Sequence, residues 1–184
     1  MAIHPYPTEL VAKWELSDGT VVETRPIRPE DAEMEQHFVR SLSESSRYFR
    51  FMNSVRELSP AMLMRFTQID YDREMAFVAV RREQGRDEEI GVARYVTNPD
   101  GKTCEFAVVI ADAWQGKGLG RRMIEILIAV ARSRGLETMV GYVLAANQPM
   151  LALCGKLGFL ISDRAGDAQV KNATLRLEPT RGLA

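Results

Sequence analysis

Gln115-Gly116-Lys117-Gly118-Leu119-Gly120-Arg121-Arg122 separates a strand-like run, Glu105 to Ile110, from an amphipathic run that begins near Met123. Glycines at alternate positions allow a tight turn in which successive backbone N–H groups converge on one point. The helix that follows adds unpaired N–H groups and the positive end of its dipole, and the basic side chains of the segment add full charges. The segment therefore predicts a loop that binds a phosphate group.

Spacing separates the kinds of phosphate-binding loop. A Walker loop requires G-x-x-x-x-G-K-[ST], and no stretch of the chain supplies it. The dinucleotide fingerprint G-x-G-x-x-G is disfavoured because Arg121 or Met123, depending on the starting glycine, occupies the position of the third glycine. Gln-x-x-Gly-x-Gly fits at Gln115, Gly118 and Gly120, and it resembles the pyrophosphate loop of the GCN5-related N-acetyltransferase (GNAT) superfamily. The alternative is a glycine-rich helix start without a ligand.

A second motif follows at the separation that this superfamily has. Asn147-Gln148-Pro149-Met150, followed by several leucines and Gly158-Phe159, resembles the segment in which an asparagine opens a helix that ends in leucine-glycine-phenylalanine. In the family this asparagine contacts the pantetheine arm of the cofactor. A plain helix cap is the alternative role for Asn147. Two motifs in the right order indicate the superfamily.

The resemblance implies acetyl-CoA as the acetyl donor, coenzyme A as the product, and a cofactor-binding core at about residues 103–159. The amine attacks directly in this family, without a cysteine intermediate. Backbone groups at the end of the strand before the loop pair with the acetyl carbonyl and the pantetheine amides. The implied cofactor-binding residues are Val108, Val109, Ile110, Gln115, Gly116, Lys117, Gly118, Leu119, Gly120, Arg121 and Asn147.

Composition agrees with an enzyme of this kind. The 184 residues, 46% of them hydrophobic, are expected to form one domain, 1–184. Charges nearly cancel, 24 basic against 25 acidic, so we expect neither nucleic acid nor a membrane as a partner. The chain shows no secretory signal or membrane span, and a cytoplasmic location is expected. Two cysteines, Cys104 and Cys154, are too few for a zinc cluster, and no metal is predicted.

Hydrophobic periodicity and turn residues outline the elements. Strands are expected at 14–16, 21–24, 75–82, 90–96, 103–110, 139–144, 159–163 and 174–177, and helices at 28–41, 44–51, 59–69, 123–134 and 149–157. This order predicts a mixed sheet with helices on both faces. The expected fold is therefore α/β (α+β mixed), a GNAT-type, mostly antiparallel sheet of about seven strands.

Acetyl transfer to an amine needs a group that accepts a proton, because an alkyl ammonium has a pKa of about 10.4 and must lose its proton before it can attack. His4 and His37 are far in sequence from the loop. Glu105 stands on the strand that leads into the loop, on the same face as Ala107 and Val109 by period-two alternation. Burial would strengthen this carboxylate as a base, and Glu105 is the predicted catalytic residue. An ion pair with a neighbouring strand is its alternative role.

The acid that protonates the departing thiolate stays open. Many family members carry a tyrosine at the position of Cys154. The Cys154 thiol, a water molecule and Tyr142 are the alternatives.

The first half of the chain bears on the amine acceptor. Residues 43–51 and 69–76 resemble the acetyltransferase domain of bacterial protein lysine acetyltransferases of the Pat type, and the likeness runs from about Arg25 to Phe159. It implies a protein lysine as the acceptor. Asp70, Tyr71 and Asp72 either line an acceptor groove or form a turn. A small amine such as a polyamine, an amino acid or an aminoglycoside, and a noncatalytic acyl-CoA-binding sensor, are the competing functions. A homodimer is expected by analogy only.

Overall fold

The centre of the molecule is an eight-stranded sheet, formed within residues 5–177, which the computed structural model describes. Its spatial order is β1-β2-β3-β4-β5-β6-β8-β7. The bounds are β1 (Ala12–Glu15), β2 (Val21–Pro26), β3 (Glu74–Glu83), β4 (Arg86–Thr97), β5 (Thr103–Ile110), β6 (Thr138–Leu144), β7 (Leu160–Arg164) and β8 (Asp167–Arg176). Only β5 and β6 pair in parallel among these strands, so the prediction of a mixed, mostly antiparallel sheet is confirmed, with eight strands instead of about seven.

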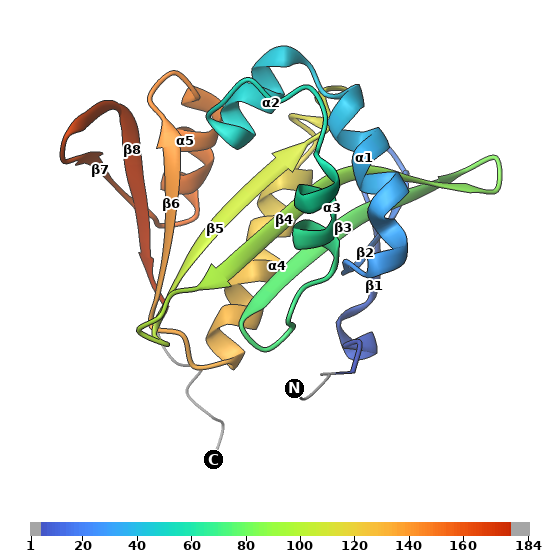
Figure 1. The fold of residues 1–184 in the computed structure, drawn as a ribbon, viewed down its shortest axis with the longest axis horizontal. Helices are drawn as coiled ribbons and strands as arrows, with labels where there is room; N and C mark the ends of the chain where they lie inside the picture. The colour runs from blue at the N-terminus through green and yellow to red at the C-terminus, as the bar shows by residue number, and fades with distance from the viewer. Residues whose placement is uncertain (1–4, 178–184) are drawn as a thin grey trace.

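Helices cover both faces of the sheet, as predicted (Figure 1). The first three, α1 (Ala32–Ser41), α2 (Glu44–Phe51) and α3 (Pro60–Thr67), pack on one face over a core that includes Phe38, Leu58 and Val78. The other two, α4 (Leu119–Ser133) and α5 (Gln148–Lys156), pack on the opposite face over the larger core. The described residues also contain three short 3₁₀ helices, η1 (Thr8–Leu10), η2 (Pro29–Asp31) and η3 (Asp112–Trp114).

Local sequence explains where the elements begin and end. Ser43 and Ser59 cap α2 and α3, since each side-chain oxygen accepts a hydrogen bond from a backbone N–H three residues on. The β3–β4 hairpin turns at Gln84 and Gly85, both with positive φ. No helix in residues 5–177 is both long and apolar enough to cross a membrane.

Three details differ from the sequence-based expectation. Helix α4 begins at Leu119, four residues before Met123, and β8 begins at Asp167 instead of Thr174. The first three residues of β8 are exposed and polar or small, so they carry no apolar alternation that could have revealed a strand. The helical spacing of Tyr48 and Phe51 predicts that both face the core, but 46% of Tyr48 is exposed.

Strands β5 and β6 diverge, and this divergence positions the site described next (Figure 1). Their pairing runs from Thr103–Thr138 to Phe106–Gly141 and ends there, although β5 continues to Ile110. The ring of Phe106 lies over Gly141, where a Cβ atom would come 2.4 Å from Cε1 of the ring. Glycine at 141 therefore lets an aromatic ring sit at the point where the two strands separate.

Candidate active site

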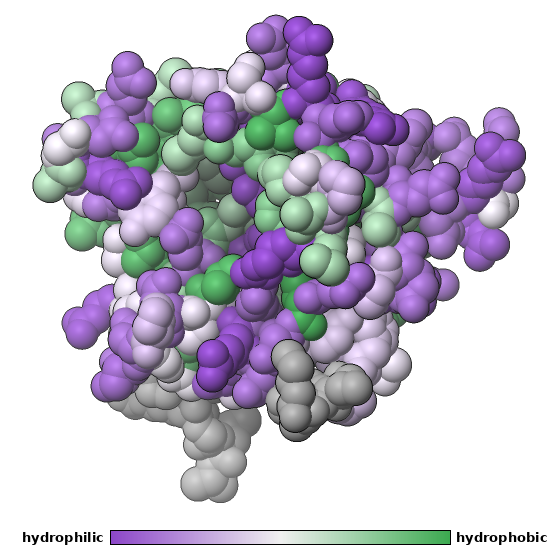
Figure 2. All heavy atoms as spheres, viewed as in Figure 1, coloured by the Kyte–Doolittle hydropathy of each residue, from purple (hydrophilic) through white to green (hydrophobic). Residues whose placement is uncertain are grey.

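A cleft of about 540 Å³ opens where β5 and β6 separate, with walls from α2, α4 and α5. Figure 2 shows this face of the molecule hollowed between α2 and β6, with hydrophobic residues around the hollow. Nine of the predicted cofactor-binding residues line it, namely Val108, Val109, Ile110, Gln115, Gly116, Gly118, Gly120, Arg121 and Asn147. Segments far apart in the chain therefore meet at one concave surface, as the two sequence motifs predicted.

The edge of β5 in this cleft is open. Just beyond β5, the backbone N–H of Ala111 donates to the carbonyl oxygen of Ile90 in β4. Backbone groups alternate in direction along a strand, so those of Val109, two residues earlier, also point toward β4. The N–H and C=O of Val108 then point to the other side, where the β5–β6 pairing has already ended. An extended amide chain can pair with this edge as an added strand would.

The glycine loop ends in an uncapped helix start. Gly116 and Gly118 have φ of 74° and 86°, values that favour glycine. Gly118 is the N-cap of α4, and among residues 5–177 no side chain accepts a hydrogen bond from the first N–H groups of this helix. These groups and the dipole of a 15-residue helix are free to bind an anion. The predicted phosphate loop therefore has the backbone geometry that it needs.

The basic side chains of the loop are less available than the sequence suggested. The ammonium of Lys117 lies 3.2 Å from Asp18 Oδ2 and 4.5 Å from the ring centroid of Trp114, and Lys117 does not line the cleft. Leu119 is buried in the core, so it can offer a ligand only its backbone. Arg121 does line the cleft, with Nε 2.9 Å from Glu125 Oε1. Main-chain N–H groups and Arg121 are what the loop presents to a ligand.

A polar network joins the loop to α2. The side-chain amide of Gln115 donates to the carbonyl oxygen of Ile110 at 3.0 Å and contacts Ser46 Oγ at 3.1 Å. Asp112 accepts hydrogen bonds from the backbone N–H and the hydroxyl of Ser43 and from the hydroxyl of Ser46, at 2.6 to 2.8 Å. Burial acts to raise the pKa of Asp112, but these hydrogen bonds hold it below its usual value. Sequence reasoning missed Asp112, whose partners lie more than 60 residues away.

Asn147 serves as a cap and also lines the cleft. Its Oδ1 accepts a hydrogen bond from the backbone N–H of Met150 at 3.3 Å, which fixes the start of α5. The two roles that the sequence left open for Asn147 are compatible, because Oδ1 makes the cap and the side chain still borders the cleft.

Glu105 lies on the predicted face of β5 but is not buried. Cys104, Phe106, Val108 and Ile110 join the core with α4, whereas Val109 joins the core under α1 to α3, so Glu105 shares the side of α2. The Glu105 side chain is exposed, so the burial that the sequence analysis considered for it is not found. Glu105 does not line the cleft, whose lining on β5 begins at the next residue, Phe106.

Arg50 of α2 lines the cleft and lies within electrostatic range of Glu105. Burial and then the nearby Arg94 guanidinium lower the pKa of Arg50 to about 10, and the charges of Glu35 and Glu105 offset this only in part. The guanidinium of Arg50 lies 5.0 Å from the ring centroid of Phe51 and 5.8 Å from that of Phe66. Within residues 5–177 it makes no hydrogen bond or ion pair. Its donors are thus available to a molecule in the cleft.

Of the candidate acids, Tyr142 lines the cleft and Cys154 does not. Cys154 is fully buried, and burial raises the pKa of its thiol to about 11. Tyr142 is 36% exposed on β6, and the guanidinium of Arg164 lies 4.3 Å from its ring centroid. Cys104 is also fully buried, and burial raises its pKa to about 12.

The remaining candidates lie away from the cleft. Tyr71 donates its hydroxyl to the carbonyl oxygen of Ile27, and Asp70 Oδ1 accepts from the backbone N–H of Asp72, which matches the turn reading of this segment. His37 is exposed on α1, and His4 lies outside the described residues. No group of three or more His, Cys, Asp or Glu within residues 5–177 could hold a metal ion.

Comparison with known proteins agrees with this geometry. The family model described as the Acetyltransferase (GNAT) domain matches residues 22–160. Acetyltransferase PA5475 of Pseudomonas aeruginosa is 44% identical over 145 residues, which cover 79% of this chain and 78% of that protein. The crystal structure of the GNAT domain of S. lividans PAT superposes with a TM-score of 0.84 at 29% identity, covering 94% of this chain and all of that chain.

A shorter match concerns a small-molecule enzyme. The L-methionine sulfoximine/L-methionine sulfone acetyltransferase of Pseudomonas paraeruginosa is 34% identical over 87 residues, which cover 43% of this chain and 51% of that protein. The acceptors of related enzymes thus include an amino-acid analogue.

Proposed function

The chain belongs to the GNAT acetyltransferase family, and from this premise we propose that it transfers the acetyl group of acetyl-CoA to the side-chain amine of a protein lysine, with residues 1–184 acting as one domain. It is an acyl-CoA-dependent N-acetyltransferase by family. The observation that carries the proposal is the open edge of β5 beside the uncapped start of α4.

The two features suit the two ends of coenzyme A. The diphosphate is an anion, and the N–H groups of residues 118–121 with the side chain of Arg121 would hold it at the helix dipole. The pantetheine arm carries amides, which match the open C=O group of Val108 and the side chain of Asn147. When bound, acetyl-CoA supplies an activated thioester carbonyl next to this strand.

Three groups of this chain would then serve the transfer. Glu105, an exposed carboxylate, takes the proton from the acceptor ammonium directly or through a water molecule. The N–H of Val108 donates to the carbonyl oxygen as negative charge develops on it, an effect worth about 3 to 4 kcal/mol in other acyl-transfer sites. The hydroxyl of Tyr142 is the group that returns a proton to the departing sulfur, since it borders the cleft and Cys154 does not.

Protein lysine is the acceptor implied by the likeness to Pat-type enzymes, and the likeness to the GNAT domain of S. lividans PAT supports it. A free amino acid is the second candidate, and Arg50 is the observation that favours it. A guanidinium that lines the cleft without a protein acceptor in residues 5–177 can bind a carboxylate through two parallel hydrogen bonds. The relative that acts on methionine sulfoximine points the same way.

The role of Glu105 is tested by Glu105→Gln, which keeps the size of the side chain and removes its basicity. We expect kcat to fall by about 10² to 10⁴ while the Kd for acetyl-CoA stays the same. Glu137→Gln is the matched control, because Glu137 is exposed, precedes β6 and pairs with Lys102 on the surface. Turnover that is unchanged in Glu105→Gln removes the catalytic assignment.

The acceptor is tested with labelled acetyl-CoA against a proteome extract and a panel of amines. Label retained on protein supports lysine acetylation. Label on free amino acids but not on their amides supports the second candidate, and in that case Arg50→Gln should raise KM for the amino acid. Tight binding of acetyl-CoA without transfer to any acceptor would identify a sensor and contradict both candidates.

A further inference from the structure

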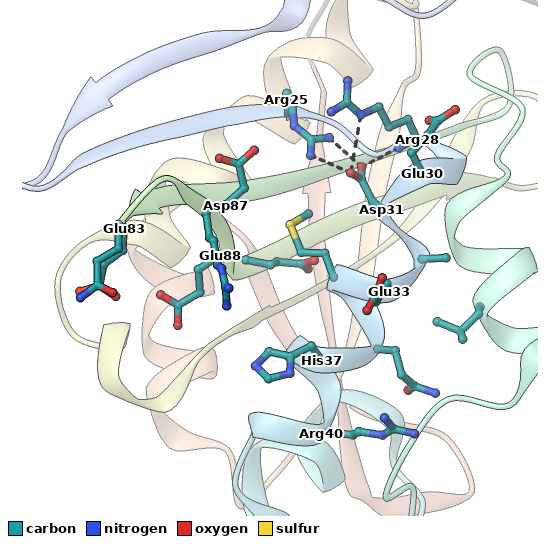
Figure 3. A pocket seen from close by; sticks show the side chains of 17 residues that line it. Arg25, Arg28, Glu30, Asp31, Glu33, His37, Arg40, Glu83, Asp87 and Glu88 are labelled. Atoms are coloured by element: carbon teal, nitrogen blue, oxygen red, sulfur yellow. Dashed lines mark hydrogen bonds and ion pairs between the residues drawn. The ribbon is translucent and has the colours of Figure 1, made fainter.

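A second concavity, of about 1200 Å³, lies between α1 and the β3–β4 hairpin. It shares no lining residue with the acetyl-CoA cleft. Figure 3 shows side chains of α1, including Glu33, His37 and Arg40, on one side and those of the hairpin, including Glu83 and Glu88, on the other. Neither the family motifs nor the proposed acetyl transfer uses this groove.

Most charges at its rim already have partners. Asp31 forms a buried double hydrogen bond with Arg25, at 2.6 and 2.7 Å. Glu83 and Glu88 both pair with Arg81. These pairs, some of which Figure 3 draws as dashed lines, account for the rim without any ligand.

Glu89 is different. It lines the groove from β4, yet only 4% of it is exposed, and neither of its carboxyl oxygens meets a hydrogen-bond donor of the protein in residues 5–177. A buried carboxylate without a partner is costly, so the group is either protonated or served by a ligand.

A second buried carboxyl group, that of Glu35, makes it more costly for Glu89 to carry a negative charge. Glu35 of α1 is 2% exposed, its Oε2 also lacks a partner within residues 5–177, and its charge acts on Glu89. Burial, then Glu35, then Asp31 raise the pKa of Glu89 well above its usual value, and Arg94 offsets this only in part. Arg94 itself directs Nη2 to the carbonyl oxygen of Phe66, not to either carboxyl group.

We infer that this groove is a second ligand site, which binds a small organic cation with an ammonium or guanidinium group on a short hydrocarbon chain. The charged group contacts Glu89, with Glu35 behind it, and the hydrocarbon lies against Met34 and Leu63, which are the partly buried apolar side chains of the lining. A cation would place a positive charge beside two adjacent buried carboxyl groups, and it would give Glu89 the hydrogen-bond donor that residues 5–177 do not supply.

The charge balance of the lining agrees with a cation. Carboxyl groups outnumber guanidinium groups, and the arginines are mostly occupied, since Arg25 and Arg28 face Asp31 and Arg40 pairs with Glu57. Arg86 also lines the groove, and its positive charge opposes a bound cation.

The test is calorimetric titration of the full chain with butylammonium, putrescine and agmatine at pH 6 and pH 8. We expect binding that is tighter at pH 8, and a heat that depends on the ionisation enthalpy of the buffer, because the cation displaces a proton held by the two carboxyl groups. Glu89→Gln should weaken binding at least tenfold. Glu83→Gln, a rim carboxyl that pairs with Arg81, is the matched control and should bind as the wild type does.

Glu35→Gln provides an independent check, because it leaves Glu89 as the contact and should remove most of the proton release. Acetyl-CoA affinity measured on the same variants keeps this inference separate from the proposed acetyl transfer, since no residue of the groove lines the cleft. The inference is overturned if none of the three cations binds at millimolar concentration, or if Glu89→Gln binds them as tightly as the wild type.

Discussion

Replacing Gly141 with alanine should disturb both stability and the acetyl-CoA cleft. A Cβ atom at this position would lie 2.4, 2.7 and 3.0 Å from three ring atoms of Phe106, against about 3.5 to 4.0 Å for carbon atoms in good contact. The ring must therefore move by about 1 Å or more. It has little room to do so, because Phe106 is buried and its centroid lies 5.1 Å from that of Phe159.

Overpacking of this kind costs about 1 to 3 kcal/mol, and in a domain of this size each kcal/mol lowers Tm by about 2 to 4 °C. We therefore expect Gly141→Ala to lower Tm by about 2 to 12 °C. Phe106 and Gly141 form the last pair between β5 and β6, and both line the cleft. A displaced ring moves toward the cleft, so KM for acetyl-CoA should rise more than kcat falls.

Thermal unfolding and steady-state kinetics measure these effects, with Gly155→Ala as the matched control. Gly155 lies in α5 with nothing near its missing Cβ, so alanine there should stabilise the protein by about 0.5 to 1 kcal/mol. In a Phe106→Leu background the clash with the ring is gone, and the cost of Gly141→Ala should largely disappear. The reasoning fails if the cost is the same in both backgrounds, or if Gly141→Ala alone changes neither Tm nor KM.

Gly118→Val should weaken coenzyme A binding about tenfold, because a β-branched residue resists the φ of 86° that the start of α4 requires; an unaltered Kd in calorimetry would contradict the phosphate loop. Tyr142→Phe should lower kcat about 10²-fold while Cys154→Ala leaves it unchanged, and the reverse result would identify the thiol as the acid. Glu89→Gln should raise Tm at pH 7 but not at pH 4. The reason is that the pKa of Glu89 is raised in the folded state, so the wild type loses stability as pH rises from the unfolded pKa of about 4.3 toward the folded pKa, by about 1.4 kcal/mol per pH unit. Tm measured from pH 4 to 7 checks this, and a gain that does not vary with pH would refute it.

Much of the fold could be read from local patterns. The bounds expected for 44–51 and 103–110 match α2 and β5, because a serine cap and a continuous run of strand-forming residues mark them. The glycine loop and Asn147 were found for the same reason, since each motif is contiguous and its physics is local. Eight of the nine predicted cofactor-binding residues in the cleft come from one strand, loop and helix start, residues 108–121, and Asn147 joins them from the start of α5.

The sequence did not predict the surroundings of a residue where these depend on segments that are distant in the chain. Glu105 alternates with buried residues on β5, yet its side chain is exposed in the folded chain. The sequence suggests that Lys117 binds phosphate, but in the structure the β1–β2 turn places Asp18 beside its ammonium group. Asp112 belongs to no motif, and its role follows from its hydrogen bonds with Ser43, the N-cap of α2, and with Ser46 of α2.

The sequence by itself determined the family, the order of the elements and the backbone of the phosphate loop, because glycine conformations and helix starts depend on neighbours within a few residues. Only the tertiary structure decided which charges are free. Arg50 and Glu89 look like ordinary surface residues in the sequence, yet within residues 5–177 one lines the cleft without a partner and the other is buried beside a second carboxyl group. Desolvation and charge pairing act through space, and the chain brings together residues that its order keeps apart.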